Sequence, residues 1–310
     1  MELRKWQARY RDYLSLVKGW SPATTDTYSR ELKPFFEFLE SYELQSLAGL
    51  TRKMLEEYRA HLYRLKPRGK NLALSTQAVR LAAIKQFARF LYREQYLLVD
   101  IGAGLEMPRR AQRLPRVVLS EREALKLLEA PNVQTPVGLR DRAMLELFYV
   151  TGMRNSELRA LTLGDFDWSR RVVYIQQGKG NKPRVVPLGE EAEIWIQEYL
   201  ARGRPQLVTD PELQRCFVGR LNAHLGRQYL ALVVRQYARK AGLTKVVTPH
   251  VLRHSCATHM LRRGAGIRQL QTLLGHAHLD TTQIYTRVEV SDLAQVIEKF
   301  HPRERCDHEL

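Results

Sequence analysis

Six side chains with basic or nucleophilic chemistry stand in four separate polar clusters between residues 151 and 286. They are Arg154, Lys179, His250, Arg253, His276 and Tyr285. Guanidinium groups match the non-bridging oxygens of a phosphodiester and stabilise their growing charge. A tyrosine hydroxyl can attack phosphorus, with histidine as the base and lysine as the acid for the leaving oxygen. Taken together, the set predicts a transfer reaction at a phosphodiester.

Taken one at a time, these clusters have simpler structural interpretations. Arg154 and Glu157 are three residues apart, so they share a helix face and can form a surface ion pair of little energetic value. Lys179 lies in a glycine-rich turn, where a lysine is usually solvated. Tyr285 alone is most simply a half-buried tyrosine. The phosphodiester interpretation therefore depends on all four clusters meeting in space.

A metal site is the main alternative for the histidines. His250 and His254 are four residues apart, but Val251 stands where a zinc protease would carry glutamate. No cysteine lies close in sequence, and no carboxylate cluster is present that would hold two metal ions. The sequence also lacks a GxxxxGK[ST] phosphate loop. We therefore expect neither a metal ion nor a nucleotide cofactor.

The composition indicates a globular protein with a polyanionic partner. Of 310 residues, 44% are hydrophobic and 27% are charged, and 50 Lys and Arg against 33 Asp and Glu give a formal net charge of +17. Nucleic acid is the first candidate partner and an acidic membrane the second. We expect no spanning helix and no signal peptide. Three widely spaced cysteines do not indicate a disulfide framework, so we predict a soluble cytoplasmic protein.

The first third of the chain predicts a helical domain over residues 1–98. Hydrophobic periodicity indicates four helices: over 3–18, from Ser21-Pro22 to about Glu40, from the cap Thr51, and from the cap Ser75. Residues 99–118 combine two Gly, two Pro and four Arg with little periodicity, and we interpret them as a linker.

A second domain is predicted over residues 119–310, beginning with a capping box at Ser120–Glu123. Helices are expected at about 120–130 and 138–151. A strand, a turn and a strand follow, from Arg171 to Gln177 and from Arg184 to Leu188. The rest is mostly helical, so the predicted fold class is mainly α with a small β-hairpin or sheet.

The last predicted helix, at about 291–300, has one apolar face. Ser291 is a suitable cap, and Leu293, Val296, Ile297 and Phe300 follow at helical spacing. A helix this short must bury that face to be stable. It can fold back on its own domain or pack on a neighbouring copy of the chain.

Four motifs together resemble the signature of the tyrosine recombinases, also called the lambda-integrase family, and especially the Xer type. They are TGMRNSEL, GKGNKPRVVPLG, TPHVLRHSCATHML and LLGHAHLDTTQIYT. His250 to Arg253, Arg253 to His276 and His276 to Tyr285 are separated by 3, 23 and 9 residues, which also fits. The resemblance covers about 119–300, whereas the first helices resemble the family's core-binding domain only in pattern. Cys256 departs from the pattern, where a larger apolar residue is expected.

The resemblance implies a helical core-binding domain, a mixed α/β catalytic domain, and a mechanism. Tyr285 would attack the scissile phosphate to form a 3′-phosphotyrosyl link and a free 5′-hydroxyl. Arg154 and Arg253 would hold the phosphate, and Lys179 would protonate the leaving oxygen. The 5′-hydroxyl of a partner duplex would then attack the phosphotyrosine and complete the exchange.

The resemblance also assigns supporting roles and partners. His250 would assist proton transfer, His276 would support the transition state, and Glu157 would orient neighbouring residues. The substrate would be a double-stranded DNA recombination site, bound by a homo-tetramer, in some systems together with a paralogous recombinase. The helix at about 291–300 would pack on a neighbouring protomer. Neither ATP nor metal is needed, because the ester conserves the bond energy.

Two other functions are compatible with parts of this pattern. A non-catalytic DNA-binding protein on the same fold would be favoured if Tyr285 or either arginine were missing, and all three are present. A type IB topoisomerase shares the chemistry but acts as a monomer without a defined site. Resolution of chromosome dimers, resolution of plasmids or transposons, and integration of mobile elements all remain compatible with these motifs.

Overall fold

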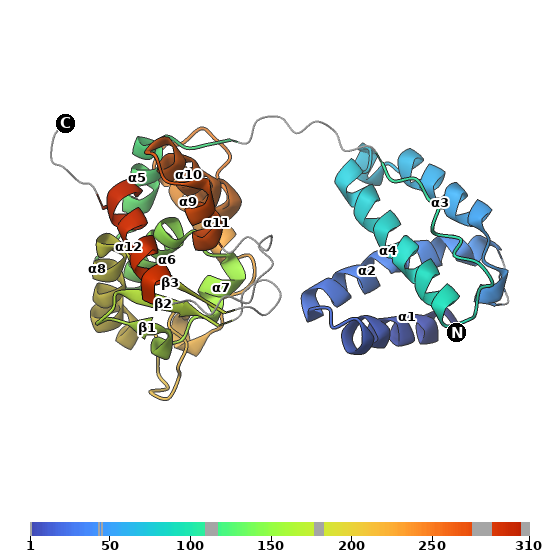
Figure 1. Ribbon diagram of the computed structural model, residues 1–310, viewed down its shortest axis with the longest axis horizontal. Helices are drawn as coiled ribbons and strands as arrows, with labels where there is room; N and C mark the ends of the chain where they lie inside the picture. Colours follow the sequence, from blue (N-terminus) through green and yellow to red (C-terminus); the bar gives the residue numbers. More distant parts are fainter. Residues whose placement is uncertain are drawn as a thin grey trace. The chain divides into compact units, whose positions relative to one another are not determined.

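The computed structural model divides the chain into two compact units, residues 1–114 and 115–310 (Figure 1). It describes residues 2–42, 44, 46–108, 117–176, 183–274 and 287–304. Each unit has its own cluster of buried hydrophobic residues. Each unit therefore folds around a separate core.

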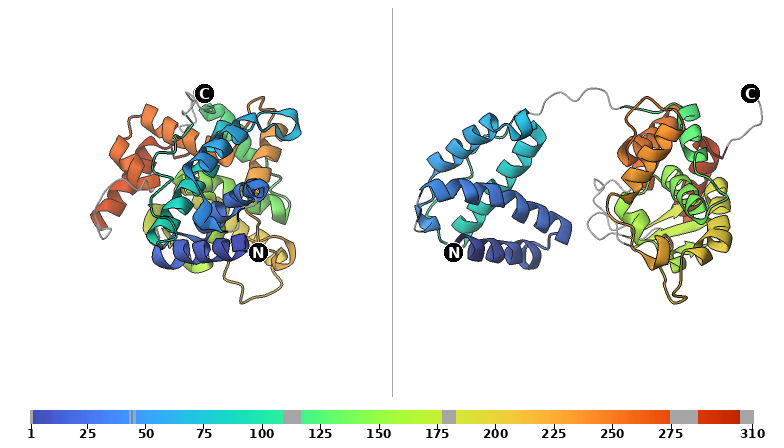
Figure 2. Two further views of the ribbon diagram at one scale, coloured as in Figure 1. Left: turned by 90° about the vertical axis from the view of Figure 1, so that its right-hand side faces the viewer. Right: turned by 180° about the vertical axis from the view of Figure 1, so that it is seen from behind.

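The first unit is helical (Figure 2). Its core is rich in aromatic residues. Its elements are α1 (Glu2–Asp12), η1 (Tyr13–Val17), α2 (Pro22–Leu39), η2 (Glu40–Tyr42), η3 (Leu47–Gly49), α3 (Arg52–Arg64), η4 (Pro67–Gly69) and α4 (Leu74–Arg93). Phe87 of α4 meets Tyr10 of α1 and Phe36 of α2 edge to face, at ring-centroid distances of 5.2 and 5.3 Å. These aromatic contacts join the three helices.

Helix starts in the first unit follow local capping chemistry in two of the three predicted cases. Ser21 and Thr51 each accept a hydrogen bond from a backbone N–H three residues later, at 3.3 and 3.4 Å. The prediction that Ser75 caps the last helix is wrong. Helix α4 begins at Leu74, and its N-cap Ala73 has no side-chain acceptor. Packing of α4 on the core outweighs the missing cap.

The predicted linker at 99–118 needs a correction at its first residues. Leu105 is buried in the core of the first unit, and Lys85 Nζ donates to the carbonyl oxygen of Ala103 at 3.1 Å. Burial of one leucine side chain is worth about 2 kcal/mol, which holds this segment on the first unit. The first unit therefore extends beyond residue 98, and residues 109–116 lie outside the described part of the chain.

The second unit combines helices with a small sheet, so the predicted fold class is confirmed. Its elements are α5 (Glu121–Glu129), α6 (Pro136–Thr151), α7 (Asn155–Ala160), η5 (Leu163–Asp165), β1 (Phe166–Asp167), β2 (Val172–Ile175), β3 (Arg184–Pro187), α8 (Glu190–Glu198), η6 (Tyr199–Gly203), η7 (Arg204–Gln206), η8 (Arg220–Asn222), α9 (Tyr229–Lys240), α10 (Pro249–Arg262), α11 (Ile267–Leu274) and α12 (Arg287–Phe300). The predicted capping box is present, because Ser120 and Glu123 satisfy each other's backbone N–H groups.

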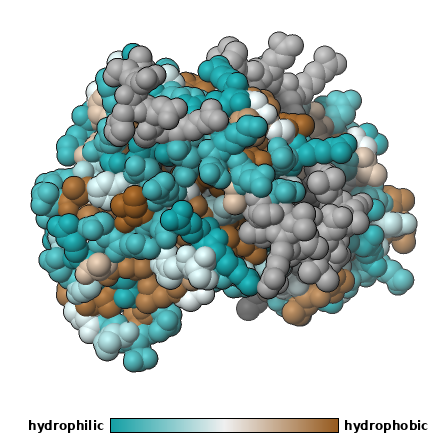
Figure 3. Space-filling model, turned by 60° about the vertical axis from the view of Figure 1, so that its left-hand side comes forward, coloured by the Kyte–Doolittle hydropathy of each residue, from teal (hydrophilic) through white to brown (hydrophobic). Residues whose placement is uncertain are grey.

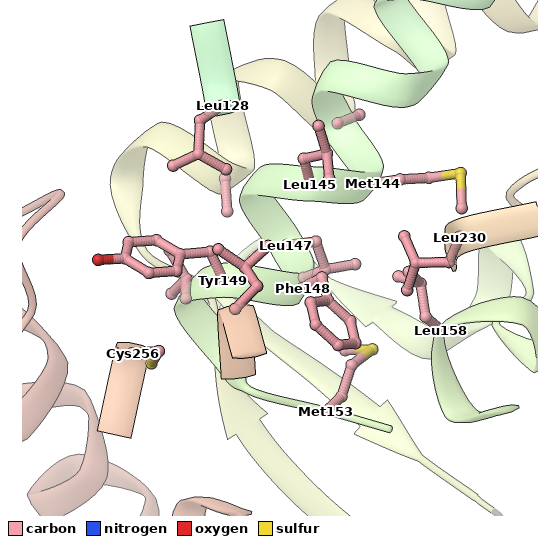
Figure 4. Packing of buried hydrophobic residues seen from close by; sticks show 14 of the residues in the cluster. Leu128, Met144, Leu145, Leu147, Phe148, Tyr149, Met153, Leu158, Leu230 and Cys256 are labelled. Atoms are coloured by element: carbon pink, nitrogen blue, oxygen red, sulfur yellow. The ribbon is translucent and has the colours of Figure 1, made fainter. Parts of the chain in front are cut away.

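Helix α6 is the centre of the second unit. All its residues from Gly138 to Thr151 are buried, and Figure 4 shows Met144, Leu145 and Phe148 among the surrounding apolar side chains. Its charged residues are paired inside the protein, for example Arg140 with Asp141 at 2.8 Å. A helix buried on all sides is a rigid support for the neighbouring site.

The sheet is antiparallel with the strand order β1-β2-β3. Strands β2 and β3 lie within the two predicted strands, and β1 was not anticipated because its two residues are too few to show alternation. In the β2–β3 register Ile175 is opposite Arg184. This register brings Arg184 to the end of the sheet next to residues 177–182, which lie outside the described ranges.

Helix α12 packs its apolar face on its own unit. Leu293, Val296 and Ile297 are all buried in the core of residues 115–310, as the first of the two sequence-based alternatives expects. The helix begins at Arg287 rather than at the predicted cap Ser291. The residues after α12 also pack on this unit, because Arg303 forms a buried ion pair with Glu146 of α6 at 2.8 Å.

His301, the residue that follows α12, is completely buried. Its burial predicts that the stability of the fold is sensitive to acid. Burial lowers the pKa of His301 to about 3, so the folded protein holds it neutral, whereas the unfolded chain protonates it near its ordinary value. Stability from this group is present above about pH 6.5 and is lost as the pH falls toward 3. One such group changes the free energy of unfolding by about 1.4 kcal/mol per pH unit, or about 2 kcal/mol between pH 6.5 and 5.

We expect His301→Gln to reduce the slope of the unfolding free energy against pH between about pH 6.5 and 5. The reduction should be about 1.4 kcal/mol per pH unit, which corresponds to one proton. The buried His259, whose pKa is also lowered by burial, accounts for acid sensitivity that remains in the variant. Gln197→Ala is the control, because Gln197 is exposed and carries no titratable group, so the slope should be unchanged. Urea unfolding at a series of pH values measures this. Equal slopes for His301→Gln and the wild type would show that His301 is not held neutral.

The surface is mostly hydrophilic, with smaller apolar patches between the polar groups, on the face shown in Figure 3. Within the described ranges, no helix has both the length and the apolar character needed to cross a membrane.

Candidate active site

Arg154 is placed by the turn that joins α6 to α7. Helix α6 ends at Thr151, and its C-cap Gly152 has φ +54°. A Cβ at Gly152 would come within 2.5 Å of Leu274 Cδ2. Glycine is therefore needed both for the backbone conformation and for the close approach of Leu274. Arg154 is the N-cap of α7, and Glu157 accepts its backbone N–H at 2.7 Å.

Glu157 is a buried carboxylate shared by two arginines, and not part of a surface ion pair. Its Oε1 accepts from Arg154 Nη1 at 2.6 Å, and Arg184 donates to both of its oxygens at 2.9 and 2.7 Å. Burial alone would raise the pKa of Glu157, but the hydrogen bonds and charge of Arg184, with those of Arg154, lower it to about 2. The carboxylate is therefore ionised at neutral pH and fixes both guanidinium groups.

Arg253 comes from α10 and is anchored by backbone carbonyl groups. Its Nη1 donates to the carbonyl oxygen of Gly152, and its Nη2 donates to that of Leu274 at 2.7 Å. Burial, followed by the nearby charge of Arg154, lowers the pKa of Arg253 to about 10, which leaves it charged at neutral pH. The structure thus brings the two predicted phosphate-binding arginines together.

His250 lies one turn before Arg253 on α10. Thr248 caps this helix by accepting the backbone N–H of Val251 at 3.3 Å. His250 is exposed, and with Arg253 and His254 it lines a pocket of about 520 Å³. His250 is therefore open to a ligand beside the arginine pair.

The third histidine of α10, His259, has a structural role. His259 is buried, its Nδ1 accepts from the hydroxyl of Tyr149 at 2.7 Å, and its Nε2 donates to the carbonyl oxygen of Leu119 at 2.7 Å. His259 is therefore a core histidine with both ring nitrogens hydrogen-bonded. Among the described residues, no group of three or more His, Cys, Asp or Glu side chains is arranged to hold a metal ion.

Three predicted site residues, Lys179, His276 and Tyr285, lie outside the described residues. The flanking elements, however, belong to the site. The chain reaches His276 two residues after Leu274, whose carbonyl oxygen accepts from Arg253. Lys179 falls between β2 and β3, and Arg184 of β3 is bound to Glu157.

Arg184 is a site residue that the sequence analysis missed. It is 4% exposed, and its guanidinium forms an ion pair with Glu157 at 2.7 Å. A signal was present in the sequence. Arg184 and Val186 are two residues apart in β3, so both side chains lie on the same, buried face of the strand. A charged residue in a buried register needs a charged partner, and Glu157 is the partner.

Removal of the Glu157 carboxylate is expected to destabilise the second unit strongly. Glu157→Ala leaves Arg184 buried without its partner, which should lower the free energy of unfolding by about 3–5 kcal/mol. Glu198→Ala is the control, because its pair with Arg202 at 2.9 Å is largely exposed and should cost about 0–1 kcal/mol. Urea unfolding at pH 7 compares them. A loss below about 1 kcal/mol in Glu157→Ala would contradict the buried network.

Comparison with known proteins decides the family. Residues 117–291 match the Phage integrase family, and residues 8–95 match the Phage integrase N-terminal SAM-like domain. The chain belongs to the phage integrase family. It is 41% identical over 288 residues to tyrosine recombinase XerC 2 of Ralstonia nicotianae, covering 93% of this chain and 83% of that protein. It is 39% identical over 289 residues to tyrosine recombinase XerD of Haemophilus influenzae, covering 93% and 95%.

Solved structures of XerH and of lambda integrase have the same fold. XerH bound to a palindromic difH substrate, in a post-cleavage complex, matches with a TM-score of 0.66 and 24% identity, covering 94% of this chain and 84% of that chain. A lambda integrase (75–356) dimer bound to a COC′ core site matches with a TM-score of 0.65 and 20% identity, covering 91% and 99%. At these identities the likeness concerns the fold. It agrees with a helical N-terminal domain and a mixed α/β catalytic domain.

Proposed function

We propose that this phage integrase family member is a site-specific DNA recombinase that cuts and rejoins duplex DNA through a 3′-phosphotyrosyl intermediate. The tyrosine recombinases of Ralstonia nicotianae and Haemophilus influenzae, similar over more than nine tenths of this chain, support the activity. The observation that carries the chemistry is the arginine pair. Arg253 binds the carbonyl oxygen of Gly152, two residues before Arg154, and both guanidinium groups are fixed.

The arginine pair supplies the positive field that the reaction needs. A tyrosine has an ordinary pKa of about 10, so its hydroxyl needs a base or a positive field to attack near neutrality. Arg154 and Arg253 would bind the non-bridging oxygens of the scissile phosphate and stabilise the charge that develops on them. Because both side chains are already held in place, little reorganisation is needed when the phosphate binds.

The remaining proposed roles complete the proton balance. A bond forms between the Tyr285 oxygen and phosphorus, while the bond from phosphorus to the 5′ oxygen breaks. The tyrosine proton passes to His250, and Lys179 protonates the leaving 5′ oxygen. His276 supports the transition state. These assignments combine the sequence motifs with the exposed position of His250 beside Arg253.

Glu157 is a positioning residue in this proposal. It holds Arg154 through the backbone N–H and the guanidinium, and it links α7 to β3 through Arg184. The reaction needs no resident metal or nucleotide, because the phosphotyrosyl ester conserves the energy of the broken bond.

We further propose that two DNA sites are joined by four copies of the chain in the cytoplasm, in some systems with a paralogous recombinase. Two of the similar structures are a lambda integrase dimer on a COC′ core site and a lambda integrase tetramer bound to a Holliday junction. Exchange of α12 between neighbouring copies would keep its apolar contacts while linking the protomers. The packing of α12 on another protomer stays a prediction.

The experiment uses duplexes that the protein selects from genomic fragments by binding. Two selected duplexes of different length, one of them end-labelled, are mixed with the protein in excess EDTA without nucleotide. We expect labelled products of recombinant length. A requirement for Mg²⁺, Zn²⁺ or ATP would contradict the proposed chemistry. Relaxation of a supercoiled plasmid that lacks the site, without recombinant products, would instead indicate a topoisomerase.

A further inference from the structure

A long connection between η6 and α9, residues 204–228, contacts α7 and the residues that follow it. At one point the connection pairs with the chain just after α7. Leu163 N donates to the carbonyl oxygen of Gln214 at 2.8 Å, and Cys216 N donates to that of Leu161 at 2.9 Å. Between these two bonds, Arg215 forms an isolated β-bridge with Thr162. The backbone of Arg215 is therefore fixed beside the end of α7.

The same connection meets α7 a second time. Asn155 Nδ2 donates to the carbonyl oxygen of Arg227 at 2.9 Å, and Arg159 Nε donates to that of Leu225 at 2.8 Å. The two sets of contacts bring Arg215 and Arg227 to α7, which carries Arg159. We call Arg159, Arg215 and Arg227 the α7 arginine cluster.

The cluster gathers three positive charges from two segments of the chain. Arg215 and Arg227 are exposed and Arg159 is half-buried, and within the described ranges none of the three forms an ion pair. Burial, followed by the charges of Arg227 and Arg215, lowers the pKa of Arg159. Like charges brought this close repel one another, so an anion bound between them would stabilise the arrangement.

The geometry of Arg159 suits an anion. Its Nε is committed to the carbonyl oxygen of Leu225, while no described acceptor takes a hydrogen bond from its two Nη groups. A guanidinium fixed through Nε presents the Nη groups as a fork, which matches two oxygens of a phosphate. A solvated arginine would lack such an anchor.

The position of the cluster relates it to the proposed cleavage site. Helix α7 has six residues and therefore spans about 9 Å, with Arg154 at its N-cap and Arg159 in its last turn. Each nucleotide of a duplex strand advances about 3.4 Å along the helix axis. A duplex whose scissile phosphate lies at Arg154 would thus present another backbone phosphate to the cluster two to three nucleotides away.

We propose that Arg159, Arg215 and Arg227 form a second phosphate site, which grips the DNA backbone two to three nucleotides from the scissile phosphate and positions the duplex. This inference rests on the proposed recombinase function. Phosphate contacts set the register of a protein on DNA without reading sequence, so the cluster is expected to act on any bound site.

The first test compares salt dependence of binding to a selected duplex. Arg215→Ala and Arg227→Ala together should weaken binding by about tenfold for each contact and lower the slope of log K against log salt by about two. Both side chains are exposed, so the variant should fold. Arg202→Ala is the matched control, because this exposed arginine lies on η6 and pairs with Glu198. A double variant with the wild-type affinity and slope would overturn the proposal.

The second test locates the contact with single methylphosphonates, which remove the charge of one phosphate at a time. For the wild-type protein, a methylphosphonate placed two to three nucleotides from the cleavage point should weaken DNA binding. For Arg159→Gln, the same methylphosphonate should cause no further loss of affinity. Arg159→Lys should restore part of the effect. If the same substitution weakens Arg159→Gln and wild type equally at every position, the cluster does not bind the backbone.

A free phosphate-type anion has the same chemistry as a phosphate of the DNA backbone. Pyrophosphate is therefore used to distinguish a site for free anions from a site for DNA. If it raises the melting temperature of wild type but not of the Arg215→Ala, Arg227→Ala variant, and the two proteins bind DNA equally, the site takes free phosphate and the proposal is wrong. A wild-type protein that binds the duplex but never cleaves it would contradict the proposed function and leave the binding result of this site intact.

Discussion

Replacing Tyr285 by phenylalanine is expected to abolish covalent attachment to DNA while leaving DNA binding unchanged. The substitution removes only the hydroxyl oxygen that would attack phosphorus, so no other group can form the ester. A nicked duplex, from which the cleaved fragment diffuses away, traps the covalent species. A denaturing gel should show a slow protein–DNA band for wild type and none for Tyr285→Phe at any time.

Tyr174→Phe is the matched control for this loss. Tyr174 lies on β2 and is partly exposed, and its hydroxyl has no hydrogen bond within the described part of the chain, so its variant should form the adduct at the wild-type rate. Gel-shift titration of both variants separates binding from chemistry. A covalent band that persists in Tyr285→Phe would remove Tyr285 from the role of nucleophile.

The second large effect is expected at Arg253. Arg253→Ala removes a fixed cation from the phosphate site, and the loss of one preorganised donor typically slows a reaction by about 10² to 10³. Arg253→Lys should not recover the rate. A lysine cannot reach the carbonyl oxygens of Gly152 and Leu274 and hold a planar fork at the same time.

Arg262→Ala is the control for Arg253, because it lies at the exposed end of the same helix. The measured quantity is the single-turnover rate of adduct formation at saturating protein, which excludes an effect on binding. A rate for Arg253→Ala within about tenfold of wild type would show that this arginine does not stabilise the transition state.

Local sequence signals predicted the parts of the fold that depend on a few neighbouring residues. The caps at Ser21 and Thr51 and the capping box at Ser120 each form within four residues, so they are visible in the sequence. Ser75 and Ser291 have the same chemistry but do not begin their helices. Helix α4 begins one residue before Ser75 and α12 begins four residues before Ser291, so a suitable cap residue does not by itself fix where a helix starts.

The site shows the same division between local and long-range information. Arg154, Glu157, His250 and Arg253 were identified from short motifs, and the structure brings them to one place. The pairing of Glu157 with Arg184 spans 27 residues and two elements, so no local pattern shows it. The α7 arginine cluster depends on a connection that returns to α7 from more than fifty residues away. Such contacts follow from the fold and not from spacing along the chain.

The most direct test of the proposed chemistry identifies the atoms that are joined in the trapped adduct. Trypsin should release residues 269–287, QLQTLLGHAHLDTTQIYTR, in which Tyr285 is the single tyrosine. Mass spectrometry is expected to find this peptide linked through Tyr285 to the 3′-phosphate of the cleaved strand, and the other fragment should accept a label directly at its free 5′-hydroxyl. A nucleotide attached to any other peptide, or a link through a 5′-phosphate, would contradict the account.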